Sequence, residues 1–353
     1  MLYLELGTHT MSQNVKVAFV AQPEYNSPLY ETDLDDLYEI RRYAIVFDPV
    51  QGDVATPTSM ADLITFAPDI AVFFRPDYVS DDLLRRIAGL KIGISTEPFP
   101  KYISGSFHYT SDSLNRLKRF TRVAVHELDY LFHYDRASLS FLELMGLRVS
   151  GSFVLPVATE VWRPPEHTSH IRDLAFIGRS TEHRERHFGL LKRDCNFLHI
   201  AHGVVGQEAL AYYHSAPIGL NIHAEAELSW EPRVQQLMAC GLLVVSEPIS
   251  PNNVLTPGEH FVQTNDPYQT YQICREILAQ PAKYEATRRA GYQKVLAELS
   301  ARQVWPRLFE RCIDRDFPLP AFDLGRVRLA PFEICAEYNG FEHLLDPFRG
   351  DHA

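Results

Sequence analysis

Arginine and glycine residues in the second half of the chain have the types and spacing expected of a phosphate-binding site. Arg233 follows a polar loop, residues 223–230, at the start of an apolar helical pattern over residues 232–240. A guanidinium group there binds phosphate in a bidentate manner and reinforces the positive end of the helix. The alternative for Arg233 is an ion pair with a nearby carboxylate, from Glu225, Glu227 or Glu231.

A second phosphate-binding candidate is the turn Gly178-Arg179-Ser180, which follows an expected strand over residues 173–177. Ser180 or Thr181 is expected to cap the next helix, and Arg184 lies in its first turns. A glycine turn that leads into a helix directs free N–H groups towards an anion. The alternative is an ordinary strand-to-helix turn with no ligand.

Two side chains of the polar loop are further candidates for ligand contact. His223 directly follows an expected strand over residues 218–222, so it is placed to touch a phosphate or a sugar. Its alternative role is that of a solvated loop histidine or a structural hydrogen-bond donor. Trp230 has a ring that stacks on a base or sugar, or else packs between the loop and its domain.

Glu97 is the candidate general base of the first half. It follows an expected strand over residues 90–95 and precedes Pro98, which restricts the loop. A carboxylate at the carboxyl end of a parallel sheet can accept the proton of a hydroxyl nucleophile. His126 and Glu127, also expected after a strand, and Glu24 after the first strand are reserves. The alternative for Glu97 is an ordinary surface glutamate.

Other familiar constellations are missing from the sequence. We expect no metal site, because no DxD follows an apolar strand, and Asp33-Leu34-Asp35 starts an expected helix. No G-x-S-x-G elbow occurs, and no dinucleotide fingerprint follows the first strand, which disfavours a dehydrogenase. We therefore expect no cofactor.

Strands and helices alternate in both halves of the sequence, which predicts parallel sheets covered by helices. After weakly patterned residues 1–14, the expected strands of the first half are 15–21, 43–47, 69–74, 90–95, 122–125 and 152–155. Residues 22–32 are expected to form a loop. The expected helices of the first half are 33–42, 59–66, 80–88 (capped by Ser80), 111–118 and 137–145.

The proline-bearing segment 156–170 is expected to link the two halves. Expected strands of the second half are 173–177, 196–200, 218–222, 242–245 and 260–263. Its expected helices are 181–192, 207–215, 232–240, 267–279, 281–299 and 304–314. Residues 317–353 have no clear place. We predict a first domain over 12–155, a second over 171–300, and a final part, 301–353, with a helix that crosses back plus a tail.

One stretch resembles a known family. Leu220-Asn221-Ile222-His223, then Arg233, Gln236 and Ala239-Cys240-Gly241, is similar to the donor-binding segment of GT-B glycosyltransferases, in the group-1-like branch that includes CgeB-like proteins. The segment from Leu155 to Pro164 resembles the family's interdomain link. The family usually has a glutamate that holds the donor's ribose where this chain has Gln236, whose amide also hydrogen-bonds hydroxyls.

The resemblance implies an α/β fold with two Rossmann-like domains facing each other across a cleft. It implies metal-independent transfer of a sugar from a nucleotide-activated donor to a hydroxyl of a glycan, lipid-linked glycan or protein. Gly178, Arg179, Ser180, Arg184, His223, Trp230, Arg233 and Gln236 would bind the donor, and Glu97 would be the base. In a retaining enzyme no base is required. Alternatives are a transferase that uses a CMP-Kdo-type donor, a sugar-nucleotide epimerase, and a non-catalytic binding protein.

Composition narrows the class of protein. The chain has 353 residues, 46% of them hydrophobic, and a formal net charge of −11, which disfavours nucleic acid as a partner. Its five cysteines are scattered, as is usual in a reducing cytoplasm. No apolar run approaches the ~20 residues that span a bilayer. We expect a cytoplasmic protein with, at most, peripheral contact with the inner membrane face, and the sequence does not fix its oligomeric state.

Overall fold

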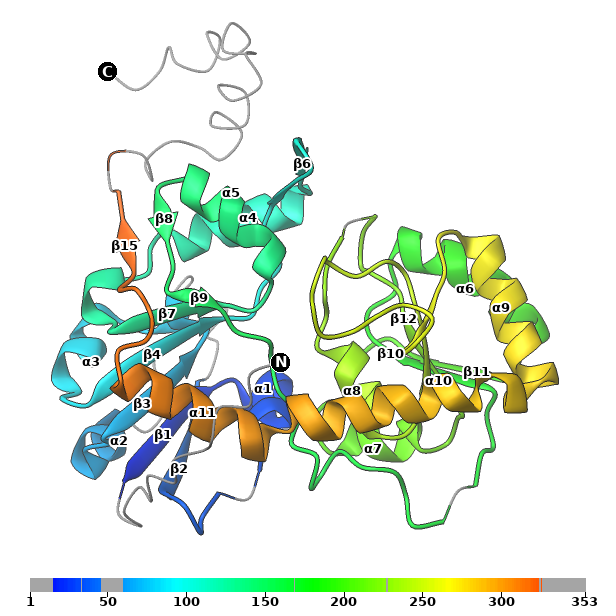
Figure 1. The fold of residues 1–353 in the computed structure, drawn as a ribbon, viewed down its shortest axis with the longest axis horizontal. Helices are drawn as coiled ribbons and strands as arrows, with labels where there is room; N and C mark the ends of the chain where they lie inside the picture. Colours follow the sequence, from blue (N-terminus) through cyan, green and yellow to red (C-terminus); the bar gives the residue numbers. More distant parts are fainter. Residues whose placement is uncertain are drawn as a thin grey trace, which may run out of the picture.

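The computed structural model describes residues 15–32, 34–45, 60–167, 169–226, 228–323 and Gly325. The expectations for residues 1–14, for the end of the 43–47 strand and for most of the tail lie outside these residues. The described chain forms two α/β lobes, each built on its own parallel sheet (Figure 1). None of the described helices is long and apolar enough to cross a membrane.

The first sheet has six parallel strands in the order β2-β1-β3-β4-β7-β9. Its centre is apolar because helices cover both faces, and every residue of β3 is buried. The strands are β1 (Lys16–Ala21), β2 (Glu39–Ala44), β3 (Ile70–Phe74), β4 (Leu90–Ser95), β7 (Tyr130–His133) and β9 (Gly151–Ser152).

Short helices and turns connect these strands. Ser80 caps α3 by accepting a hydrogen bond from the Leu83 N–H, as the sequence predicted. The helices are α1 (Pro23–Tyr30), α2 (Met60–Phe66), α3 (Asp81–Arg86), α4 (Ser111–Phe120) and α5 (Leu139–Leu144), with 3-10 turns η1 (Pro76–Tyr78), η2 (Val125–Glu127) and η3 (Arg136–Ser138). Two small antiparallel pairs, β5 (Lys101–Ile103) with β6 (Ser106–His108) and β8 (Leu147–Arg148) with β15 (Ala321–Phe322), lie outside the main sheets.

Several expectations for the first half are wrong. The helix expected over 33–42 is instead a turn followed by β2. Because β2 is an edge strand with exposed polar residues, its sequence resembles that of a charged surface helix. The loop expected over 22–32 contains α1, which starts at a proline. The strand expected over 122–125 is replaced by η2, and the true strand, β7, starts at Tyr130, five residues after the end of the expected strand. The strand expected over 152–155 shrinks to β9.

The second half follows the predicted alternation closely. Its sheet has five parallel strands in the order β11-β10-β12-β13-β14. The strands are β10 (Leu174–Ile177), β11 (Phe197–Ile200), β12 (Ile218–Asn221), β13 (Leu243–Ser246) and β14 (Val262–Gln263). The helices are α6 (Glu182–Asp194), α7 (Glu208–Tyr213), α8 (Arg233–Ala239) and α9 (Pro267–Ala279), with Thr181 as the cap of α6.

A long helical run connects the lobes along one side of the molecule (Figure 1). It consists of α10 (Pro281–Lys294), the π-helical turn η4 (Val295–Leu299) and α11 (Ala301–Ile313). The α11 segment lies against the first sheet: the Trp305 indole donates a hydrogen bond to the Leu29 carbonyl (2.8 Å), and its ring packs against Phe19. The Tyr130 hydroxyl donates to the Cys312 carbonyl (3.0 Å).

The connecting segment around residues 156–170 is also packed. Val157 forms a parallel bridge with Ser300, and Trp162 is buried. The side-chain amide of Gln235, on α8, donates to the Leu155 carbonyl (2.9 Å). One hydrophobic cluster therefore continues from the first sheet through this segment to α8 and α11. These contacts fix the two sheets with their carboxyl ends towards a common groove.

Candidate functional site

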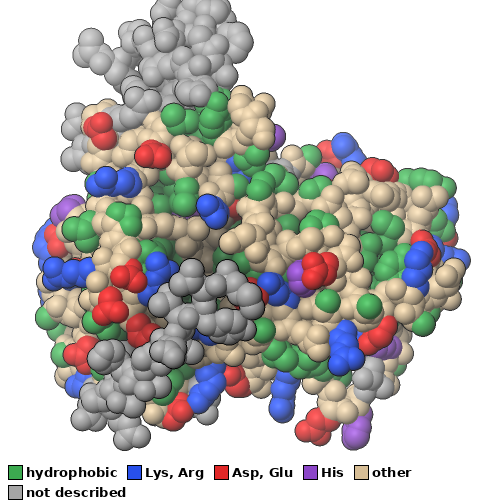
Figure 2. Space-filling model, viewed as in Figure 1, with side chains coloured by type: hydrophobic (Ala, Val, Ile, Leu, Met, Phe, Trp, Pro, Cys, Tyr) green, Lys and Arg blue, Asp and Glu red, His purple; other side chains and the backbone are tan. Residues whose placement is uncertain are grey.

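The groove between the lobes is a cavity of about 860 Å³. The loops after β1, β3 and β4 line one side, and the loops after β10, β11 and β12 line the other. Strand carboxyl ends are the usual ligand-binding edge of such sheets. On the face shown in Figure 2, acidic and basic side chains are mixed without a large area of one sign.

Two arginines and a glutamate form the cationic wall of the second lobe. Arg233 makes an ion pair with Glu231 (2.8 Å), and Arg184 lies 3.7 Å from the same carboxylate. Both guanidinium groups lie over the ring of Phe176, with guanidinium carbons 4.6 and 4.9 Å from its centroid. Arg184 is held by hydrogen bonds to the carbonyls of Ile222 (2.9 Å) and Arg179 (3.0 Å).

The positive charges of this wall outnumber its negative charges, because two guanidinium groups share one carboxylate. Burial, and then the nearby Arg233, lower the pKa of Arg184 to about 10. Although burial opposes the shift, Arg233 and its neighbours keep the pKa of Glu231 far below its usual range, so this carboxylate is ionised. Arg179 adds a third, exposed guanidinium to the lining. A bound anion would relieve the repulsion among these groups.

Gly178 makes room for this arrangement. Its φ of +154° disfavours other residues, and a Cβ there would lie 3.2 Å from a guanidinium nitrogen of Arg233. Its N–H already donates to the Ile200 carbonyl (2.9 Å). Gly178 therefore lets the Arg233 guanidinium approach the backbone closely. Its N–H is not free to bind an anion, because it is used within the sheet.

The other candidates of this lobe divide into two groups. Arg179 and Gln236 line the cleft. Ser180 is exposed and donates to Glu185 instead. Trp230 is buried behind the wall, where its indole N–H donates to the Gln235 side chain (3.0 Å), so it has the packing role that the sequence left open.

His223 is buried between the cleft and a neighbouring pocket. Its ring donates to the Pro248 carbonyl (2.9 Å), and its other nitrogen lies 3.6 Å from Glu231. Burial lowers its pKa, but the hydrogen bond and charge of Glu231 outweigh that effect and raise it. His223 therefore supports the cationic wall through Glu231 from behind.

Glu97 lines the opposite side of the cleft, in the first lobe. It forms ion pairs with Arg75 and with Arg116 of α4. Arg75 is buried in a left-handed conformation (φ 58°), binds Asp77 with two nitrogens (2.9 and 2.7 Å) and stacks on Tyr78. Protonation of Glu97 would break two ion pairs, so its pairing has to change before it accepts a proton.

The reserve bases lie in different places. Glu24 lines the cleft and is exposed. His126 and Glu127 lie in η2, which precedes β7, so the expectation that they follow a strand is wrong. The Glu127 carboxylate pairs with Arg85 (2.9 Å) at the amino end of the sheet.

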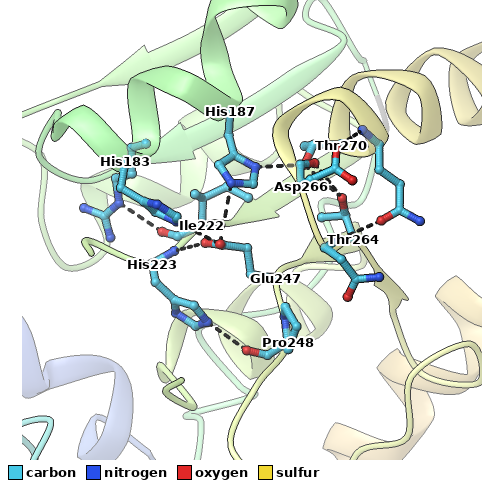
Figure 3. Close-up of polar contacts among 12 residues, drawn as sticks. His183, His187, Ile222, His223, Glu247, Pro248, Thr264, Asp266 and Thr270 are labelled. Carbon is cyan, nitrogen blue, oxygen red and sulfur yellow. Dashed lines mark hydrogen bonds and ion pairs between the residues drawn. The ribbon is translucent and has the colours of Figure 1, made fainter. Parts of the chain in front are cut away.

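The structure also joins residues that sequence reasoning missed. The Tyr134 and Ser229 hydroxyls hydrogen-bond across the groove (3.0 Å), and Ser250 donates to Asp135 of the first lobe (2.6 Å). These contacts depend on how the two lobes are arranged relative to each other, and no local sequence pattern predicts that arrangement. A group of His183, His187 and Glu247, of which the last two are buried, was also missed and is shown in Figure 3. The His-x-x-x-His spacing on a helix was its available signal.

Comparison with known proteins shows what this chain resembles in sequence and in fold. Residues 173–310 match the model of a family described as glycosyl transferase-like. No match was found among the sequences of curated proteins. HepE from Anabaena, solved in complex with UDP-glucose, is similar in structure with a TM-score of 0.57 at 9% identity, over 85% of this chain and 99% of that one.

Two further solved structures are similar over 85% of this chain and 100% of their own. One is an α-glucosyltransferase in complex with UDP-glucose and DNA containing an abasic site, with a TM-score of 0.57 and 10% identity. The other is sucrose-phosphate synthase from Thermosynechococcus elongatus, with a TM-score of 0.54 and 11% identity. At such identities the likeness establishes the fold, and the prediction of a GT-B arrangement is confirmed. With the family match to residues 173–310, the prediction of a glycosyltransferase-type enzyme is also confirmed at that general level.

Proposed function

We propose that this chain transfers a sugar from a nucleotide-activated donor to a hydroxyl of a glycan, a lipid-linked glycan or a protein. The observation that carries the proposal is the pairing of Arg184 and Arg233 with one carboxylate, Glu231, at the carboxyl edge of the second sheet, with Arg179 as a further cation in the cleft lining. This surplus of guanidinium charge fits the phosphate groups of a nucleotide sugar. Gln236, which also lines the cleft, would hydrogen-bond the donor's ribose hydroxyls.

The acceptor enters from the first lobe. Its hydroxyl oxygen bonds to the anomeric carbon while the bond from that carbon to the phosphate oxygen breaks, and the electron pair leaves with the phosphate. Arg233 and Arg184 stabilise the charge that develops there, as fixed cations do in other transfers. In an inverting reaction Glu97 takes the hydroxyl proton after its ion pairs rearrange. The arginines supply the leaving-group stabilisation, so this step requires no metal.

Arg233→Ala tests the proposal. We expect transfer or hydrolysis of the donor to fall about 10²- to 10³-fold, the usual effect of losing one group that stabilises developing charge. Arg186→Ala is the matched control, because Arg186 is an exposed arginine of α6 that pairs with Glu182. The assay starts with UDP-glucose, since similar structures are described with it. Near-normal turnover in Arg233→Ala, with a donor that wild type uses, would refute the proposal.

A thermal-shift panel of UDP-, GDP-, ADP- and CMP-linked sugars separates the alternatives. A transferase is stabilised by its donor and releases nucleotide when acceptor is added. A CMP-linked donor alone would indicate the CMP-Kdo-type alternative, which Gln236 leaves open. Isomerisation of the donor without acceptor would indicate an epimerase, and a shift without turnover a binding protein.

Finer assignments rest on the sequence. We propose the CgeB-like branch because of Leu220-Asn221-Ile222-His223 and the later Ala239-Cys240-Gly241. A cytoplasmic location agrees with cysteine usage: the described cysteines, Cys195, Cys240, Cys274 and Cys312, are free thiols. Peripheral contact with the inner membrane face would be needed for a lipid-linked acceptor.

A further inference from the structure

A second cluster of polar side chains lies in the second lobe, on the side of the sheet covered by α6 and α9 (Figure 3). His183 and His187 are four residues apart on α6 and so share one face of it. Glu247 directly follows β13. One ligand-type atom from each residue lies within 4.8 Å of the others. The adjoining pocket, of about 430 Å³, shares no described lining residue with the cleft.

We propose that His183, His187 and Glu247 form a site for a divalent transition metal of the zinc class. Two imidazoles and one carboxylate, with an open fourth position, are a common zinc donor set. Glu247 Oε1 lies 2.8 Å from His183 Nε2 and 3.5 Å from His187 Nε2. Ligands of a tetrahedral zinc ion lie roughly 3.3 Å apart, given bond lengths near 2 Å. The pocket supplies the open side for a water ligand.

Hydrogen bonds behind the cluster orient His187 as a ligand. The Thr270 hydroxyl donates to the Asp266 carbonyl, which leaves its oxygen to accept from His187 Nδ1 (2.9 Å). With the His187 proton on Nδ1, the Nε2 lone pair is directed at Glu247 (Figure 3). Such outer hydrogen bonds are typical of metal-binding histidines.

The charge of Glu247 supports a cation at this place. The residue is only 8% exposed. It accepts the His223 N–H (2.7 Å) and contacts the two histidines, and no lysine or arginine of the described chain makes an ion pair with it. A buried carboxylate requires compensation, and lone pairs of His187 and Glu247 that face each other are unfavourable. A divalent cation between them satisfies both groups.

The metal would have a positioning role, because it lies outside the cleft. Glu247 holds the His223 backbone, and the His223 ring in turn lies against Glu231, the carboxylate between Arg184 and Arg233. An ion on Glu247 would therefore fix His223 and, through its ring, the Glu231 carboxylate of the cationic wall. The sugar-transfer step proposed above does not pass through this ion.

The test is metal binding by the full-length protein after chelator treatment and dialysis. We expect one equivalent of Zn²⁺ by calorimetry, the absorption bands of tetrahedral Co²⁺, and a higher melting temperature with Zn²⁺. Glu247→Gln keeps the side-chain shape and the acceptor for His223, and it should lose binding. Thr270→Val should weaken it roughly 10- to 100-fold, as loss of an outer hydrogen bond does. His126→Asn, at an exposed histidine, is the matched control and should bind like wild type.

Absence of Zn²⁺ and Co²⁺ binding by the wild type would overturn the proposal and leave a hydrogen-bonded His–Glu cluster. So would wild-type affinity in Glu247→Gln. If that variant does not fold, judged by circular dichroism, His183→Asn replaces it, because His183 is the most exposed of the three ligands. The assay uses no sugar donor, so it stands even if the proposed transfer fails.

Discussion

Each lobe presents a carboxylate between two arginines to the cleft, but the surroundings of the two groups differ. In the first lobe Glu97 lies between Arg75 and Arg116, and Asp77 and Asp112 also pair with these arginines. In the second lobe Glu231 lies between Arg184 and Arg233, and Arg179 adds a further cation. The first group has an excess of carboxylates, and the second an excess of guanidinium groups.

This difference separates two chemical tasks. A surplus of cations suits the side that holds phosphate, whereas a surplus of carboxylates suits the side that receives a hydroxyl and its proton. Asp112 supports the separation: burial raises its pKa, while Arg179, from the opposite lobe, counteracts that rise.

The largest effect on activity is expected from Glu97→Gln. If Glu97 is the base, the turnover number should fall about 10²- to 10⁴-fold because proton transfer is lost. Donor affinity should stay near wild type, because the arginines of the second lobe are unchanged. Steady-state kinetics and donor calorimetry measure the two quantities. Glu127→Gln, at the far edge of the sheet, is the control. Unchanged turnover would show that the first lobe's carboxylate surplus has no part in the chemistry.

Arg75→Gln should reduce stability most strongly. Arg75 is 7% exposed, and its loss leaves the buried Asp77 carboxylate and Glu97 without their shared partner. Breaking a buried ion pair costs about 3–5 kcal/mol, which urea unfolding would measure. Arg85→Gln removes an exposed pair with Glu127 and should cost only about 0.2–1 kcal/mol. Equal losses in both variants would contradict a structural role for the Arg75 network.

Gly178→Ala should damage the second lobe's wall specifically. The new methyl group would approach Arg233 and Phe176 closely and strain the backbone, at a cost of about 1–3 kcal/mol. We expect weaker donor binding by calorimetry. Gly189→Ala fills open space on α6, so it should leave donor binding intact. If both substitutions were silent, close packing at Gly178 would have no influence on the arginines.

The smallest effect concerns His133, which lies inside the first lobe behind the charged edge. It is fully buried and stacks on Phe99, and its ring nitrogens have no hydrogen-bond partner among the described residues. Burial, and then Lys101, hold its pKa well below the usual value. Because the unfolded chain takes up a proton near pH 6.5 and the folded one does not, stability is intact above about pH 6.5 and declines below it. His133→Phe should reduce this acid sensitivity in unfolding experiments at pH 7 and pH 5. An identical decline in both proteins would contradict the prediction.

Sequence patterns predicted the second sheet better than the first for a physical reason. Strands β10, β12 and β13 are short apolar runs with clear glycine or proline boundaries, so their periodicity is visible. The edge strand β2 carries the exposed residues Glu39, Arg41 and Arg42, and these charges resemble the polar face of a helix. Helix α1 contains Pro28 as well as starting at Pro23, and its composition favoured a loop.

The candidate site was predictable in part. Arg233, Gly178 and Glu97 follow strands in sequence, and the rule that ligands bind at strand carboxyl ends brought them together. Which arginine pairs with which carboxylate depends on side-chain geometry. The sequence therefore did not predict that Arg75 and Arg116 pair with Glu97. Glu247 lies 60 residues after His187, and only the packing of α6 against the sheet makes them neighbours.

The long run of α10, η4 and α11 has a consequence for synthesis on the ribosome. The first sheet needs Trp305 and the rest of α11 to cover Phe19 and its neighbours, yet these residues are translated only after the whole second sheet. An emerging first lobe therefore exposes an apolar face until α11 arrives. The lobe that is made first is completed last, and a nascent chain halted near residue 300 would need chaperone protection at that face.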